Sequence, residues 1–286
     1  MLRCHEEIKV RFSRPRKALV KQPLRTAFSR LLVFSLFVFC GAGAAAQTAP
    51  KILKRDDLLF RKEMYTDKKG AKMPYRLYVP QDYDATKKYP LIFWFHGGEG
   101  RGFDNERQIT GANELGTHLW TTRENQAQFP AFVLAPQCPS ESNWGDPDLN
   151  DVNPQLQMAL DILAIVQKKY LIDPDRIYLV GQSMGGLGAW ALLQTFPQKW
   201  AAALILCSFD NFSNAPGIAR VPLWIFQGDA DLTVPLNLVQ AMVKQLKKAG
   251  GQPRYFEYHK VGHEVWEKAF AEPDVVSWLS EQKRTN

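Results

Sequence analysis

The chain has 286 residues, of which 45% are hydrophobic and 23% charged, a composition typical of a soluble globular protein. Its formal net charge is +7, but nine of the 36 Lys and Arg and two of the 29 Asp and Glu lie within residues 1–46. Residues 47–286 therefore carry 27 basic and 27 acidic side chains, a balance that excludes the basic signature of a protein that binds nucleic acid or an anionic membrane.

Residues 1–46 have the three parts of a secretory signal peptide. A basic segment precedes the apolar run Leu31 to Cys40, and small residues follow, with Ala44 and Ala46 as the A-x-A pair before Gln47. The apolar run is short for a spanning helix, so we expect cleavage, a periplasmic or secreted protein and no membrane association afterwards. Because the basic segment is unusually long, retention as an anchor is the alternative. We expect residues 47–286 to form a single domain.

The first part of that domain predicts a hairpin followed by a buried strand. From about Leu58 to Pro80, two segments with alternating or clustered apolar residues flank the polar turn 66–72, a pattern typical of an antiparallel hairpin. The continuous apolar run 90–95 predicts a strand covered on both faces. It ends in the glycine-rich loop 96–102, which lacks the Lys-Ser/Thr of a Walker motif and the spacing of a dinucleotide fingerprint.

Another apolar run over 129–136 predicts a second buried strand, and 137–153 predicts a loop. The acidic string Asp146 to Asp151 in this loop has part of the spacing of a calcium loop, but it lacks the glycine and the closing glutamate. We therefore expect no metal site there. Asn153 and Pro154 predict the N-cap and first turn of a helix.

The segment 176–190, RIYLVGQSMGGLGAW, predicts a strand, a tight turn and a helix, with Ser183 at the turn. Gly181 and Gly185 flank the serine at the G-x-S-x-G spacing of a nucleophile elbow, where strand and helix backbones converge and leave no room for side chains. In an elbow the serine oxygen is exposed above the sheet, and the N–H of Met184 can donate to an oxyanion.

The glycine-rich loop is the expected second half of the oxyanion hole. We expect the N–H of Gly98 to converge with that of Met184, with the main chain of Glu99 as the alternative donor. For His96 we expect a bracing role, through hydrogen bonds of its ring, and no catalytic one.

Strands are predicted over 201–207, 221–227 and 254–259, with a helix over 236–249. Strands alternating with helices indicate an α/β fold: a mainly parallel twisted sheet with helices on both faces and the hairpin at one edge. In this order Cys138 and Cys207 end strands three positions apart, about 14 Å, so we expect both to be free.

Three loops after strands carry Ser183, Asp231 and His263, in the chain order of an α/β-hydrolase triad. Carboxyl ends of parallel strands share one edge, so these loops should meet. A serine needs a base within hydrogen-bond reach, and the base needs an orienting group. Asp229 is the competing acid and His259 the competing base, but Asp231 lies further beyond its strand and His263 lies in a loop.

Two tryptophans, Trp144 and Trp266, lie close to strand-end loops, and with Glu99 they are the candidates for substrate contact. We expect one tryptophan to stack on an aromatic or sugar portion of the substrate. Packing beneath the loops is the alternative for both. No metal or organic cofactor is required by this machinery.

These motifs resemble the α/β-hydrolase superfamily. The resemblance extends from about Leu58 to Leu279 and is carried by YRLYVP, PLIFWFHGGEGRG, VLAPQCP, DPDRIYLVGQSMGGLGAW, GDADLTVP and VGHEVW. It is to secreted bacterial esterases, including the phospholipase/carboxylesterase and polyhydroxybutyrate-depolymerase-like groups and enzymes labelled prolyl-oligopeptidase-like peptidases. The resemblance implies the same nucleophile, acid, base and oxyanion donors.

The sequence therefore predicts a secreted serine hydrolase that cleaves a carboxylic ester, on a small molecule or a polymer, through an acyl-serine intermediate. A prolyl-oligopeptidase-like peptidase is the second interpretation, because the same machinery cleaves amides. A non-catalytic binding module on the same fold is the third.

Overall fold

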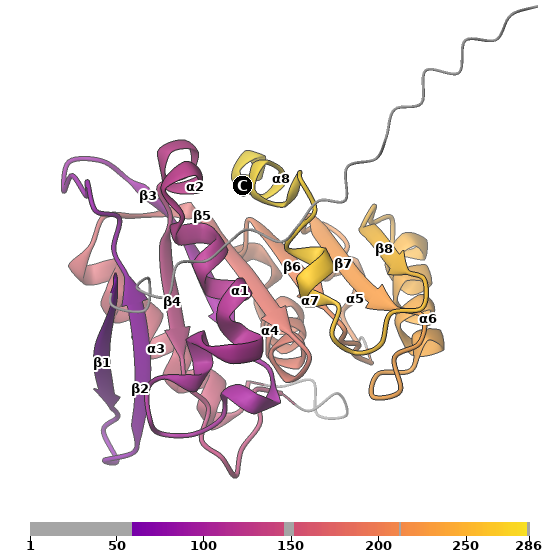
Figure 1. Cartoon of the computed structure of the whole chain (residues 1–286), viewed down its shortest axis with the longest axis horizontal. Helices are drawn as coiled ribbons and strands as arrows, with labels where there is room; N and C mark the ends of the chain where they lie inside the picture. Colours follow the sequence, from indigo (N-terminus) through magenta and orange to yellow (C-terminus); the bar gives the residue numbers. More distant parts are fainter. Residues whose placement is uncertain (1–58, 146–151, 212, 285–286) are drawn as a thin grey trace, which may run out of the picture. The chain divides into compact units, whose positions relative to one another are not determined.

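A computed structural model describes residues 59–145, 152–211 and 213–284. The expected signal peptide and the acidic string 146–151 lie outside these residues. The described part contains one eight-stranded sheet with the order β1-β2-β4-β3-β5-β6-β7-β8 (Figure 1). The expected α/β-hydrolase fold class is confirmed.

The strands form where the sequence has its apolar runs. The first two, β1 (Phe60–Thr66) and β2 (Lys72–Tyr78), make the predicted antiparallel hairpin, and β2 also pairs antiparallel with β4. All pairs from β4 to β8 are parallel. These strands are β3 (Tyr89–Phe95), β4 (Phe132–Pro136), β5 (Ile172–Gln182), β6 (Ala202–Leu206), β7 (Leu223–Gly228) and β8 (Arg254–Tyr258).

Helices cover both faces of the sheet, and each face has its own hydrophobic core. One face carries α3 (Pro154–Lys169), α4 (Met184–Thr195), α5 (Ala215–Ile218) and α6 (Leu236–Lys248). The other carries α1 (Glu114–His118), α2 (Arg123–Gln128), α7 (Trp266–Ala269) and α8 (Val275–Glu281). The central strands are buried on both sides, which explains their unbroken apolar sequences.

Helix α3 begins where the sequence predicted, at the Asn153-Pro154 pair. The side chain of Asn153 accepts a hydrogen bond from the N–H of Leu156 at 2.9 Å, and Pro154 occupies the first turn of α3. Between β3 and β4 the chain forms only short helical pieces, three of them 3-10 turns before α1. This irregular stretch leads from the glycine-rich loop 96–102 to α1.

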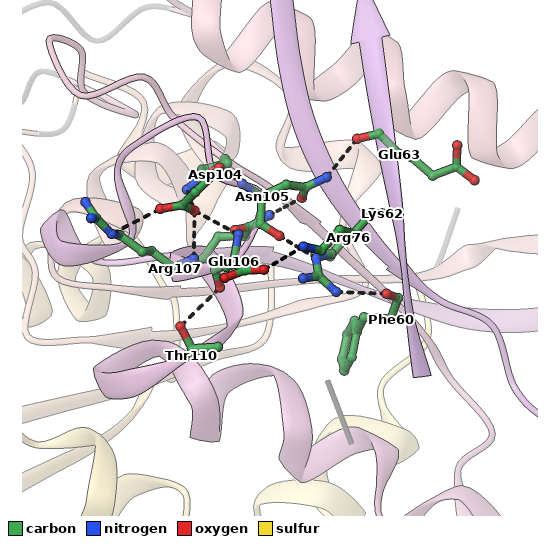
Figure 2. Close-up of polar contacts among 11 residues, drawn as sticks. Phe60, Lys62, Glu63, Arg76, Asp104, Asn105, Glu106, Arg107 and Thr110 are labelled. Atoms are coloured by element: carbon green, nitrogen blue, oxygen red, sulfur yellow. Dashed lines mark hydrogen bonds and ion pairs between the residues drawn. The ribbon is translucent and has the colours of Figure 1, made fainter. Parts of the chain in front are cut away.

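A buried polar network fastens this irregular stretch to the hairpin (Figure 2). Arg76 of β2 is 5% exposed and donates to the carbonyl oxygens of Asn105, at 2.5 Å, and Phe60, at 3.0 Å. Asn105, which has a φ of +56°, donates in turn to the carbonyl of Glu63. The hairpin is therefore tied to the loop that follows β3.

Both expected free cysteines are buried and unpaired. Burial raises the pKa of the Cys138 thiol to about 12 and raises that of Cys207 further. Within the described residues, no helix has the length and hydropathy needed to cross a membrane.

Candidate active site

The turn between β5 and α4 is a nucleophile elbow. Ser183 has a φ of +52° and a ψ of −120°, a strained conformation for a residue with a side chain. A Cβ on Gly181 would collide with the carbonyl of Gly185, and one on Gly185 would collide with the carbonyl oxygen of Phe95. The two glycines are therefore required by the close approach of α4 to strands β5 and β3.

Ser183, His263 and Asp231 form one hydrogen-bonded chain at the carboxyl edge of the sheet. Nε2 of His263 lies 2.7 Å from Oγ of Ser183, and Nδ1 lies 2.8 Å from Oδ2 of Asp231. A carboxylate only accepts hydrogen bonds, so Nδ1 carries the proton and Nε2 is free to accept the serine proton. The structure thus brings together the three side chains that the sequence singled out.

The Asp231 carboxylate is enclosed yet well supplied with donors. Its side chain is fully buried, and burial by itself opposes ionisation. The N–H groups of Val234 and Thr233 donate to Oδ1 at 2.9 and 2.8 Å, and His263 and Gln227 contact Oδ2. These donors outweigh the burial and hold the pKa of Asp231 below its ordinary value.

The competing pair, Asp229 and His259, forms a separate contact outside the site. Nδ1 of His259 lies 2.7 Å from Oδ2 of Asp229, and the N–H of Lys260 donates to the other oxygen at 2.6 Å. His259 is 78% exposed, and neither side chain contacts Ser183 or His263 through a hydrogen bond. This pair ties the end of β7 to the turn after β8.

The two candidate oxyanion donors lie in the loop after β3 and at the start of α4. Gly98 begins a 3-10 turn, Gly98–Gly100, and Met184 is the first residue of α4. Among the described residues, neither the Gly98 N–H nor the Met184 N–H donates to a protein acceptor. Both are thus available to a ligand oxygen. Glu99, the alternative donor, is exposed in the same turn.

His96 braces this loop from below. Its Nε2 accepts from the N–H of Cys138 at 3.0 Å, so Nδ1 carries the proton and donates to the carbonyl of Gly97 at 2.7 Å. The ring is fully buried, and burial lowers its pKa to about 4. A neutral histidine with both nitrogens occupied matches the structural role expected for it.

Two buried amides that the sequence did not single out hold this region: Asn113 bonds to the glycine-rich loop, and Gln182 bonds to the segment before α1. Asn113, 1% exposed, accepts from the N–H of Gly97 at 2.8 Å and donates to the carbonyl of Arg107. Gln182, the residue before the nucleophile, donates to the carbonyl of Ala112 at 3.0 Å. Only the position of Gln182 inside the G-x-S-x-G motif gave a signal; Asn113 lies in a stretch without a pattern.

Trp144 takes the alternative that the sequence left open, packing beneath the loop. The side chain is fully buried, with its ring 5.2 Å from those of Phe95 and His96, and its Cβ lies against Gly188 of α4. Burial of a large apolar ring in this core is favourable, which explains why Trp144 packs inward although it lies close to a strand-end loop. Trp266 remains at the site: its ring is perpendicular to that of His263, with centroids 6.1 Å apart.

The described residues contain no cluster of His, Cys, Asp and Glu that could hold a metal ion. What the arrangement can do chemically is acyl transfer: it has a nucleophile, a base oriented by a buried carboxylate, and the N–H groups of Gly98 and Met184, which have no protein acceptor among the described residues.

Comparison with known proteins agrees with this geometry. Residues 67–272 match the family model described as "Putative esterase". A solved structure, "Crystal Structure of a Thermostable Esterase", is 33% identical with a TM-score of 0.76; it aligns with 80% of this chain, which spans 64% of that structure.

Curated relatives are more distant. "Probable feruloyl esterase C" of Aspergillus niger (strain ATCC MYA-4892 / CBS 513.88 / FGSC A1513) is 24% identical over 68% of each chain. "Probable carboxylesterase SOBER1-like" of Arabidopsis thaliana is 22% identical over 68% of this chain and 80% of its own. With its fold, its elbow and the match over most of its length, the chain belongs to the esterase family of the α/β-hydrolase superfamily.

Proposed function

We propose that this protein hydrolyses carboxylic esters with Ser183 as nucleophile, His263 as general base and acid, and Asp231 as the group that orients the histidine. The observation that carries the proposal is the continuous hydrogen-bonded chain from Ser183 through His263 to Asp231. It is assembled from three loops 32 or more residues apart in sequence, at the end of β5, β7 and β8.

The chemistry follows from the positions of the protons. His263 Nε2 accepts the Ser183 proton as Oγ attacks the ester carbonyl carbon, and the resulting oxyanion accepts hydrogen bonds from the N–H groups of Gly98 and Met184. The imidazolium, stabilised by the ionised Asp231, then protonates the leaving alcohol as the bond to carbon breaks. Water, deprotonated by His263, then attacks the acyl-serine; the imidazolium returns the proton to Oγ of Ser183 as the acyl bond breaks, and the carboxylic acid leaves.

The test is hydrolysis of p-nitrophenyl esters of increasing acyl length, with feruloyl and acetyl-xylan esters and a proline-containing amide. We expect ester turnover that falls to background in Ser183→Ala. The feruloyl ester is included because of the feruloyl esterase relative. Amide turnover without ester turnover would replace the proposal by a peptidase. No turnover of any of these substrates would favour a non-catalytic binding module.

We also propose that residues 1–46 direct export and are removed, which makes the mature enzyme periplasmic or secreted. The basic segment, the apolar run and the A-x-A pair support this proposal. N-terminal sequencing of protein recovered from the periplasm or medium of an expressing bacterium should begin at Gln47. A full-length chain found only in the membrane fraction would favour the anchor.

A further inference from the structure

A pocket of about 490 Å³ lies beside the candidate active site. One wall comes from the segment 111–115, which continues from the oxyanion loop, and the other comes from the segment 264–267, which follows His263. The two walls belong to α1 and α7 and the residues just before them, on the same face of the sheet (Figure 1). The pocket is therefore framed by segments that both adjoin the catalytic machinery.

Contacts connect each wall to the triad. On one side the carbonyl of Ala112 accepts from the side chain of Gln182, the residue before Ser183. On the other, the ring of Trp266 lies 6.1 Å from that of His263. Because His263 delivers the proton to the departing oxygen, the leaving group of an ester lies next to the histidine. This placement assigns the pocket to the alcohol part of the substrate.

The lining is acidic and has no compensating base. Glu114, Glu264 and Glu267 contribute three formal negative charges, and no lysine, arginine or histidine lines the pocket. Among the described residues, none of the three carboxylates has a hydrogen-bond or ion-pair partner, whereas Glu106 pairs with Lys62 at 2.6 Å. Three unpaired carboxylates around one pocket repel one another and attract a cation.

Trp266 provides a second, independent indication of a ligand. Its side chain is 9% exposed, yet its indole N–H has no acceptor among the described residues. The nitrogen is also not one of the fully enclosed atoms, unlike Nε1 of Trp144. A buried tryptophan usually finds a partner for this group, so the unpaired N–H of a residue that lines the pocket is suited to an oxygen of a bound molecule.

We propose that this pocket is the leaving-group subsite and that it selects alcohols bearing an ammonium group. The carboxylates of Glu114, Glu264 and Glu267 attract the cation, and the Trp266 ring adds an aromatic surface that favours a cation. The inference rests on the proposed esterase function, since it assigns a substrate class to the same site.

The test compares two acetate esters of the same shape, acetylcholine and its uncharged isostere 3,3-dimethylbutyl acetate. At low ionic strength we expect kcat/KM to be roughly tenfold higher for the cationic ester, and added salt to reduce the ratio. The triple variant Glu114→Gln, Glu264→Gln, Glu267→Gln should bring the ratio close to one. Glu281→Gln, an exposed glutamate on α8, is the matched control and should leave the ratio unchanged.

The outcomes separate this inference from the proposed function. Equal kcat/KM for the two esters, or a preference that survives in the triple variant, overturns the cation subsite while hydrolysis dependent on Ser183 leaves the esterase intact. Hydrolysis of both esters that persists in Ser183→Ala would instead contradict the proposed function, and the subsite with it.

Discussion

Asp229 and Asp231, which are separated by one residue, have different surroundings at the end of β7. Asp231 is enclosed, accepts two main-chain N–H groups and contacts His263, whereas Asp229 contacts the exposed His259. The sequence favoured Asp231 as the acid because it lies further beyond the strand. The structure shows that the two carboxylates differ in burial and in hydrogen-bond donors. Only Asp231 can hold the histidine in the tautomer that accepts the serine proton.

This pair gives a matched test at the scale of single residues. Asp231→Asn should lower kcat by on the order of 10³- to 10⁴-fold, because the amide no longer fixes the tautomer of His263. Asp229→Asn removes a carboxylate of the same loop and should leave kcat within about twofold. Both are measured as initial rates on a p-nitrophenyl ester. Equal losses in the two variants would contradict the assignment of the acid.

Asn113 is a positioning residue for the oxyanion loop. Asn113→Ala leaves the buried N–H of Gly97 without an acceptor, so the loop carrying Gly98 shifts. We expect kcat to fall by roughly tenfold to 100-fold with KM little changed, since the oxyanion forms only in the transition state. Asn113→Asp keeps an acceptor and should recover part of kcat. Unchanged kcat in a folded Asn113→Ala would rule out this role.

At the scale of elements, the elbow depends on contact between backbones. A methyl group on Gly185 would collide with the carbonyl oxygens of Phe95 and His96. The main chain there is held by the sheet and cannot move aside. Gly185→Ala should destabilise the fold by on the order of 4 kcal/mol, measured by urea unfolding. Gly262→Ala is the control, because the nearest atom to its added Cβ is 4.0 Å away. Similar stability of the two variants would argue against the packing described for the elbow.

Elements were predictable because their signals are local. Apolar runs marked β3, β4 and β6 to within about three residues, and the Asn153-Pro154 pair marked the start of α3. The role of Asn113 could not be read from sequence, because it rests on a contact with Gly97, 16 residues away in an irregular stretch. The role of Trp144 stayed open for a related reason: proximity to a strand end does not reveal whether a ring points outward or into the core.

At the scale of the whole molecule, the site depends on parts far from the chemistry. The hairpin holds the stretch after the oxyanion loop through Arg76 and Asn105, and His96 holds the loop itself (Figure 2). The family resemblance predicted the fold and the triad residues, and the bracing role of His96 was expected from the sequence, but the tie through Arg76 and Asn105 was not. Low pH is expected to weaken the support that His96 gives to the loop, because His96 must stay neutral in the folded state.

Burial holds the folded-state pKa of His96 at about 4, below the ordinary histidine value of 6.5. The unfolded chain therefore binds the proton first, and this contribution to stability is complete above pH 6.5 and is lost as the pH falls toward 4. Between pH 7 and 5 the loss attributable to His96 is about 2 kcal/mol. Urea unfolding at the two pH values should show a smaller loss in His96→Gln. An equal pH dependence in both proteins would contradict this account.

The central claim is that Ser183 is an activated nucleophile, and the most direct measurement is reaction of the protein with a fluorophosphonate followed by mass mapping of the modified peptide. The account predicts a single adduct on Ser183, formed much more slowly in Asp231→Asn and at the original rate in Asp229→Asn. An unmodified Ser183, or labelling that persists in Ser183→Ala, would contradict it.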